Sequence, residues 1–459
     1  MVERLAGLAH LAGRVRDGAV SPTELVQESL RRIEASHADL NAVVSVDADR
    51  ALDEAAGHPR TGALAGLPLL VKDMARCRGS RTTFGSPLFV DAPPDEIDDI
   101  VVARLRAAGA IVVGRTNTPA FGHAPFTTNV VFGPTRNPWN LERSPGGSSG
   151  GSTAALIAGL APLATASDGG GSVRIPSSCC GLVGYKPTMG AIGRNVLPRW
   201  LEFSTQGVAG RTVADVVHEA NVTLGAAPGD WVSVPAGTVD PEPTMPRMVF
   251  TCRSFRADVD PVVEAAVVAA VQSLAADGVE VVEVDPPSDP GSVFDWFVMS
   301  SAELAQSLGD VRDQWEAFEP SLAAMLTFGE QVSAADYIAA QRRRHEIGAR
   351  IDAVVGSDAV LVLPTLNVRS WAPEGPVPSD AGSVVDDPTI ATNTPELNAT
   401  GHPAVSVPVG FDEAGVPIGM QVVAPRFRDG LALGVAARLE QIRPWPTVAG
   451  GYEPFPGLS

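Results

Sequence analysis

Short apolar runs alternate with amphipathic stretches along most of this chain. The runs predict strands at residues 41–46, 111–114, 163–166, 248–252, 279–284, 359–364, 404–408 and 418–423. The amphipathic stretches predict helices at residues 21–36, 100–108, 262–276 and 430–442, a short helix after residue 46, and another after residue 152. Strands that alternate with helices are typical of an α/β protein. We therefore expect a central, mixed but mostly parallel twisted sheet flanked by helices.

The chain has no internal repeat and no clean linker, which indicates one large domain over residues 1–459. Its pattern divides that domain into a helical N-terminal segment (about 1–40), a core (about 60–215), a substrate-shaping region (about 220–395) and closing strands with a helix (about 396–445). Stretches rich in proline and glycine at residues 226–246 and 371–387 are interpreted as long loops, which often shape a pocket.

Composition describes a soluble globular protein and excludes several functions. Of the 459 residues, 45% are hydrophobic and 19% charged, which suffices for a large core. A net charge of −19 argues against binding nucleic acid or an anionic membrane. The first residues lack the pattern of a secretory signal, and no apolar run is long enough to span a bilayer. The four cysteines form no C-x-x-C motif, so we expect neither zinc nor disulfides and a cytoplasmic location.

Lysine is very rare in this chain, which has Lys72 and Lys186 against 32 arginines. Arginine does not give up its proton in a protein, whereas a buried lysine can become a neutral amine and act as a base. Lys72 ends an apolar run, where burial would lower its pKa. Two lysines could also persist by chance, so their scarcity alone does not decide between a chemical and a structural role.

Two glycine-serine clusters, SPGGSSGGS at 144–152 and SDGGGSVR at 167–174, lie close together in the sequence. Such glycine density lets backbone N–H groups approach a ligand closely. A phosphate-binding loop is disfavoured because Ser152 stands where that motif needs lysine. An esterase of the α/β-hydrolase type would use Ser149 of GSSGG as nucleophile, with a histidine from among His218, His345 and His402. Tight turns without chemistry are a further alternative.

A third chemistry combines both clusters with Lys72. A serine hydroxyl is a poor nucleophile until a neighbouring base removes its proton, and a desolvated amine can do so without a histidine. The run GGGS at 169–172 places successive backbone N–H groups beside the hydroxyl of Ser172, as a developing oxyanion requires. Lys72, a serine of the first cluster and Ser172 would then form one catalytic unit.

These residues resemble the amidase signature family of hydrolases. The resemblance rests on GLPLLVKD (66–73), GPTRNPWN (133–140), both serine clusters, GYKPT (184–188), RTVAD (211–215), HPAVSVPVG (402–410) and PIGMQVV (417–423). It extends from about residue 20 to 445 and is weakest between about 220 and 395. One departure is Ser167, where the family more often has threonine. The resemblance implies the amidase signature fold.

Carried over by position, the resemblance gives each motif residue a role. It makes Ser172 the acyl-enzyme nucleophile, Ser148 the bridging serine held by a cis peptide bond, and Lys72 the base. The amides of Gly169, Gly170, Gly171 and Ser172 would form the oxyanion hole. Asp168 and Arg174 would orient the nucleophile loop through a buried ion pair, with Ser149 as the rival bridging residue. Lys186 is interpreted as structural, and no metal or organic cofactor is implied.

The sequence says less about the substrate. We expect the pocket to include Phe126, Thr127, Leu197 and Trp200, with Phe294, Trp296, Phe297 and Trp371 in or beside the same regions. Such residues favour a bulky, uncharged amide or carbamate (urethane), and an ester is an alternative. A monomer or homodimer acting alone is the first expectation. The alternative is the glutaminase subunit of a tRNA-dependent amidotransferase, which belongs to the same family and would need a partner chain.

Overall fold

The computed structural model describes residues 7–242, 245–251, 254–255, 259–288, 291–379, 383–384 and 391–458. Its strands are β1 (Val43–Val46), β2 (Pro68–Lys72), β3 (Ile111–Thr116), β4 (Leu163–Asp168), β5 (Val183–Lys186), β6 (Thr205–Gly210), β7 (Arg247–Phe250), β8 (Val281–Glu283), β9 (Ala359–Pro364), β10 (Pro378–Ser379), β11 (Ser383–Val384), β12 (Ala404–Phe411) and β13 (Pro417–Val423). All predicted strands are present. Cys252, at the end of one of them, lies outside the described residues.

The helices are α1 (Leu8–Arg16), α2 (Pro22–Leu40), α3 (Ala48–Ala56), α4 (Ile100–Ala107), α5 (Gly150–Ile157), α6 (Arg174–Cys180), α7 (Val213–Thr223), α8 (Pro261–Ala276), α9 (Ser292–Ser307), α10 (Pro320–Gln331), α11 (Ala334–Val355), α12 (Pro395–Thr400) and α13 (Asp429–Ile442). Short 3-10 turns are η1 (Pro87–Phe89), η2 (Ala120–Gly122) and η3 (Gly309–Ala317). The predicted helices are confirmed. Ser21 and Glu24 form a capping box at the start of α2. In the described part of the chain, no helix has both the length and the apolar character for crossing a membrane.

Eleven strands form one mixed sheet in the order β1-β3-β2-β4-β6-β5-β12-β13-β9-β7-β8. The pairs β2–β3, β2–β4, β7–β8 and β7–β9 are parallel, and the six other pairs of this sheet are antiparallel. The mixed sheet is therefore confirmed, but antiparallel pairing predominates where we expected mostly parallel pairing. The reason is local: β12 and β13 are joined by a short turn at 412–416, which cannot make the crossover that parallel strands need.

Both faces of the inner strands β2 and β9 are buried, which explains why these strands are continuous apolar runs, whereas the edge strands β1 and β8 are largely outside the core. In β2, Leu70 packs on one face in a cluster that includes residues of α2 and α5. Leu69 and Val71 pack on the other face with residues of α1 and α4. In β9, Val360 and Val362 pack with α7, α8 and α13, while Leu361 and Leu363 pack with α11. Lys72 thus continues a strand that is enclosed on both sides.

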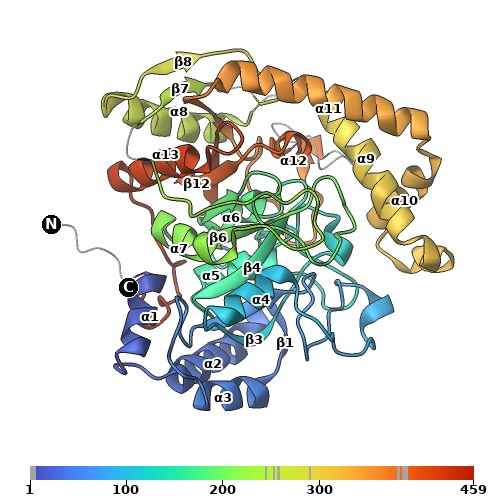
Figure 1. Cartoon of the computed structure of the whole chain (residues 1–459). Helices are drawn as coiled ribbons and strands as arrows, with labels where there is room; N and C mark the ends of the chain where they lie inside the picture. The colour runs from blue at the N-terminus through green and yellow to red at the C-terminus, as the bar shows by residue number, and fades with distance from the viewer. Residues whose placement is uncertain are drawn as a thin grey trace.

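Helices α9, α10 and α11 form an arm along one side of the molecule, drawn in yellow and orange in Figure 1. None of the three was predicted from the sequence. Their apolar residues pack largely on one another, as Met299 of α9, Leu326 of α10 and Ala340 of α11 do within one cluster. The arm belongs to the region expected to shape the substrate pocket. That region also supplies β7, β8 and β9 to the main sheet, so it is more than a set of loops.

Candidate active site

Lys72 and Asp168 end two neighbouring parallel strands, β2 and β4, so both lie at the same edge of the sheet. The backbone N–H of Lys72 donates to Thr165 Oγ1 at 2.8 Å, which ties the end of β2 to β4. The first serine cluster precedes α5, and the second follows β4 and leads into α6. The carboxyl ends of parallel strands are where α/β sheets commonly place their ligand sites. The fold therefore brings the predicted base and both serine clusters to one place.

The Lys72 amine is surrounded by serine hydroxyls. Its Nζ lies 2.8 Å from Ser148 Oγ, 2.8 Å from Ser149 Oγ and 3.3 Å from Ser167 Oγ. The side chain is buried, and burial lowers the pKa of Lys72 to about 7, although the negative charge of Asp168 acts in the opposite direction. The amine is thus accessible in its neutral form near neutral pH, with hydroxyl protons within reach.

Ser148 and Ser149 are equally close to the amine but differ in what else they contact. Ser148 lines a cavity together with Lys72 and Ser172. Ser149 is fully buried, is not part of the cavity wall, and donates to the Ser167 carbonyl oxygen at 3.4 Å. The Ser149 N–H donates to the Ser172 carbonyl oxygen at 3.3 Å, so the two serine clusters contact each other. The position of Ser148 favours it for proton transfer toward the cavity.

The peptide bond between Gly147 and Ser148 is cis, as the family resemblance implied. A side chain at Gly147 would collide with the backbone of Phe126, whose atoms would lie 2.7 Å from an added Cβ. Thr127 Oγ1 donates to the Gly146 carbonyl oxygen at 2.9 Å and accepts the Gly150 N–H at 3.1 Å. Phe126 and Thr127 therefore support the serine loop from behind. We expected both residues in the substrate pocket, and neither lines the cavity that contains Lys72, Ser148 and Ser172.

Asp168 organises the loop that carries Ser172. Its carboxylate accepts the N–H groups of Gly171 at 2.8 Å and Val173 at 3.2 Å. Arg174 forms an ion pair with the same carboxylate at 2.9 Å, and both side chains are fully buried. Burial would raise the pKa of Asp168, but the charge and hydrogen bonds of Arg174 outweigh it and hold this pKa well below its usual range. The expected buried ion pair is thus present, and the carboxylate stays ionised.

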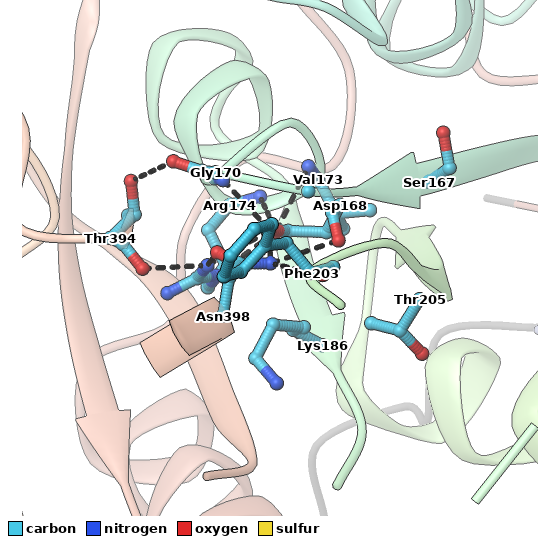
Figure 2. Close-up of polar contacts among 12 residues, drawn as sticks. Ser167, Asp168, Gly170, Val173, Arg174, Lys186, Phe203, Thr205, Thr394 and Asn398 are labelled. Atoms are coloured by element: carbon cyan, nitrogen blue, oxygen red, sulfur yellow. Dashed lines mark hydrogen bonds and ion pairs between the residues drawn. The ribbon is translucent and has the colours of Figure 1, made fainter. Parts of the chain in front are cut away.

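A second set of residues, from distant parts of the chain, fixes this loop (Figure 2). Thr394 Oγ1 donates to the Gly170 carbonyl oxygen at 2.7 Å, and Asn398 donates to Asp168 Oδ1 at 2.9 Å. Trp296 Nε1 donates to the Gly169 carbonyl oxygen at 2.9 Å, and its ring leaves no room for a side chain at Gly170. Sequence reasoning missed Thr394 and Asn398 because no motif surrounds them. The sequence analysis expected Trp296 in or beside the pocket, and in the structure its ring packs against the loop that carries Ser172.

The loop amides differ in availability. The Gly171 N–H is taken by Asp168, as described above. In the described part of the chain, the N–H groups of Gly170 and Ser172 have no internal hydrogen-bond acceptor. Gly169 and Ser172 line the cavity, and the Ser172 side chain is nearly buried there. An oxygen bound beside Ser172 could therefore meet free amide donors.

The cavity itself has a volume of about 620 Å³. Its catalytic end is formed by Lys72, Ser148, Ser167, Gly169 and Ser172. The segment 193–201 forms another wall, and α9 and α11 contribute Glu303, Gln306, Ser307 and Tyr337. Of the four expected pocket residues, Trp200 lines the cavity as a buried side chain and Leu197 lines it while mostly exposed. A pocket of this size is typical of sites for small organic molecules.

The histidines that an esterase triad would need lie elsewhere. His218 Nε2 contacts the carbonyl oxygen of Ala63, and His402 contacts Thr400 and Asp352. His345 is on the exposed side of α11. Among the described residues that line the cavity there is no histidine. The alternative with Ser149 as nucleophile therefore lacks both its base and an open nucleophile.

Lys186, the second lysine, is also buried, but outside the cavity wall. Its Nζ donates to the Pro187 carbonyl oxygen at 2.9 Å. Burial lowers the pKa of Lys186 to about 7, and the charge of Arg174 lowers it further, while Asp168 and Asp429 act against them. This placement agrees with the structural role expected for Lys186.

Comparison with known proteins places this geometry in a family. The Amidase family model matches residues 24–433. An acylamidase of Rhodococcus erythropolis is 33% identical over 455 residues, covering 95% of each chain. A glutamyl-tRNA(Gln) amidotransferase subunit of Synechococcus sp. (strain CC9605) is 35% identical, covering 93% of this chain and 94% of the relative. The crystal structure of a bacterial aryl acylamidase of the amidase signature family aligns with a TM-score of 0.89 at 26% identity, covering 96% of this chain and 97% of that one.

The chain therefore belongs to the amidase signature family, as its motifs indicated. It is a hydrolase of that family, acting on carbon–nitrogen bonds of amides. The chain resembles the acylamidase and the amidotransferase component to the same degree, so the comparisons do not choose a substrate.

Proposed function

We propose that this protein is a self-sufficient amidase that works through an acyl-enzyme on Ser172. The observation that carries the proposal is the buried Lys72 amine, 2.8 Å from Ser148 Oγ at the end of a cavity that Ser172 also lines. Neutral Lys72 takes a proton from Ser148, which takes one from Ser172, and the Ser172 oxygen attacks the amide carbonyl. The proton then returns through Ser148 to the leaving amine, and water hydrolyses the acyl-enzyme.

The negative oxygen formed in each step would be bound by backbone amides of the second cluster. We assign this role to Gly169, Gly170 and Ser172, and we leave out Gly171 because its N–H already donates to Asp168. Such donors act at full strength because the surrounding loop is fixed before the reaction by Asp168, Arg174 and Thr394. Asp168 and Arg174 thus serve the reaction through the position of the loop.

The substrate class that we propose is a bulky amide or carbamate, with esters as slower alternatives. The cavity volume of about 620 Å³ and the indole of Trp200 in its wall support a large group beside the scissile bond. Both amides and carbamates have a carbonyl that Ser172 can attack and an amine that must leave with a proton. We expect a cytoplasmic enzyme that is a monomer or homodimer.

The test is a panel of 4-nitroanilides, carbamates and esters assayed with the wild-type protein and with Ser172→Ala. Mass spectrometry of the Ser172 peptide should show an acyl adduct whose mass identifies the acid part of the substrate. Turnover that persists in Ser172→Ala would contradict the proposal. The second candidate function is a component of an amidotransferase, because the chain is 35% identical to one such protein. Release of ammonia from glutamine only when a second chain is added would support it.

A further inference from the structure

Arg199 lies in the wall of the cavity that contains Ser172 and has no carboxylate partner among the described residues. The other arginine from the same segment, Arg194, is paired with Asp230 at 3.2 Å. A guanidinium has five N–H donors, and in the described part of the chain the one acceptor that Arg199 meets is the Ser307 carbonyl oxygen at 3.2 Å. Its Nε is buried and has no acceptor. The charge of Arg199 therefore has no compensating carboxylate within the residues that the structure describes, in the wall of the cavity that Lys72 and Ser172 also line.

Three aromatic rings hold this guanidinium in place. Its central carbon lies 5.1 Å from the ring centre of Phe84, 5.9 Å from that of Phe89 and 5.0 Å from that of Phe121. Cation–π contacts orient a guanidinium while leaving its edge free for an anion. Phe84 and Phe121 themselves line the cavity. The group is thus a positioned cation on an apolar platform.

The neighbouring charges do not neutralise it. Arg76 lines the same cavity, and its charge acts on Arg199. Burial lowers the pKa of Arg199 to about 10, so it remains a cation at neutral pH. The acids of the wall contact groups other than Arg199: Glu303 accepts the Tyr337 hydroxyl at 2.7 Å, and Asp99 accepts the backbone N–H of Arg76 at 3.0 Å and interacts with the charge of Arg76. In a chain of net charge −19, a cavity-wall arginine without a carboxylate partner among the described residues needs a reason.

We propose that Arg199 is a substrate-specificity residue that binds a carboxylate, so that the preferred substrates are amides carrying a carboxylate on a group remote from the scissile bond. A planar carboxylate matches the guanidinium edge with two parallel hydrogen bonds. The apolar part of such a substrate would lie against the aromatic platform. This differs from the uncharged substrate expected from the sequence, and it rests on the proposed function in that both use the same cavity.

The test compares matched substrates that differ only in charge. Glutaryl 4-nitroanilide carries a carboxylate on the acyl side, and pentanoyl 4-nitroanilide lacks it. Hexanoyl-4-aminobenzoate carries a carboxylate on the amine side, and hexananilide lacks it. The wild-type enzyme should prefer the anionic member of at least one pair by about 10- to 100-fold in kcat/KM, mainly through KM. Arg199→Gln should remove that preference, and Arg199→Lys should retain part of it. Arg438→Gln, which removes a surface arginine paired with Asp277, should leave the ratio unchanged.

Binding separates this inference from the proposed mechanism. In Ser172→Ala, calorimetric titration with glutaryl 4-nitroanilide should show binding that weakens with salt and is lost in the Ser172→Ala, Arg199→Gln double variant. If this binding were observed but the wild-type enzyme hydrolysed none of the amides, the proposed mechanism would be contradicted and the carboxylate site at Arg199 would still be supported. Equal kcat/KM within both substrate pairs, or a parallel loss for neutral and anionic substrates in Arg199→Gln with an unchanged melting temperature, would overturn the assignment of Arg199.

Discussion

The two lysines of this chain make a natural comparison, because they share burial and differ in surroundings. Each ends a strand, Lys72 in β2 and Lys186 in β5, and burial lowers the pKa of each to about 7. Asp168 acts on both amines. Yet Lys72 faces three hydroxyls and a cavity, whereas Lys186 donates to a backbone carbonyl away from it. Figure 2 shows Lys186 beside the Asp168–Arg174 network without a contact drawn to it.

This difference shows that a lowered pKa alone does not make a lysine a catalytic base. Desolvation follows from any closed position in the fold. A base also needs a proton donor within hydrogen-bond reach and a route from that donor to the substrate. Lys72 meets both conditions through Ser148, and Lys186 meets neither. Variants at the two sites test this distinction, and the largest effect is expected from the amines themselves.

Removing each amine in turn should show the difference between the roles of Lys72 and Lys186 most clearly. Lys72→Met and Lys72→Arg should each lower kcat/KM by about 10³- to 10⁴-fold, because methionine has no base and arginine cannot become neutral. The matched variant Lys186→Met should stay within about 5-fold of wild type. The measurement is steady-state hydrolysis of a nitroanilide, with circular dichroism to show that each variant is folded. Substantial activity in Lys72→Arg would exclude Lys72 as the base.

The two hydroxyls next to Lys72 should also differ. Ser148→Ala should lower kcat by about 10²- to 10³-fold, because it interrupts proton transfer between Lys72 and Ser172. Ser149→Ala removes a hydroxyl outside the cavity and should cost less than about 10-fold. Burst kinetics would show whether acylation is the step that slows. If Ser149→Ala proved the more damaging change, Ser149 would be the bridging serine.

Activity should rise with pH as Lys72 loses its proton. With a pKa of about 7 for the free enzyme, kcat/KM should increase about tenfold per pH unit well below pH 7 and level off above pH 8. Because Lys186 is outside the cavity, Lys186→Met should move this midpoint by less than about 0.3 units. A pH–rate profile of both proteins with a neutral substrate provides the measurement. A large shift in Lys186→Met would mean that the two amines are coupled.

The smallest expected effect concerns stability. Lys186 has a pKa of about 7 in the folded chain and about 10.4 in an unfolded one, so between these values the unfolded chain binds more protons. The contribution of this amine to the free energy of unfolding should therefore increase with pH across that window. Lys186→Met should remove the increase and gain more stability at pH 7 than at pH 9.5, by about 1 kcal/mol or more. The measurement is urea unfolding of wild type and Lys186→Met at the two pH values. If this reasoning were wrong, the difference in free energy of unfolding between the two proteins would be the same at both pH values.

Much of this protein could be predicted from its sequence because the relevant signals are local. Apolar runs identified the strands, and the serine clusters with Lys72 identified the residues that the structure brings together. The arm helices could not be predicted because their apolar residues pack largely on one another. The antiparallel pairing of β12 with β13 was missed, although the short turn between them is a local signal. Phe126 and Thr127 do not line the cavity as expected, because a sequence does not show which side of the serine loop a residue contacts. Arg199 was missed because only the structure shows which arginines lack a partner.

The arm formed by α9, α10 and α11 has a consequence for how such enzymes diversify. It contributes Glu303, Ser307 and Tyr337 to one wall of the cavity, while the proposed reacting groups lie on β2 and the serine loops, more than 100 residues earlier. Apart from Trp296, which holds the Gly169 carbonyl oxygen, positions of the arm can therefore change with little effect on the proposed chemistry. Natural selection could reshape what enters the cavity, and a protein engineer could do the same by randomising a few positions on α9 and α11.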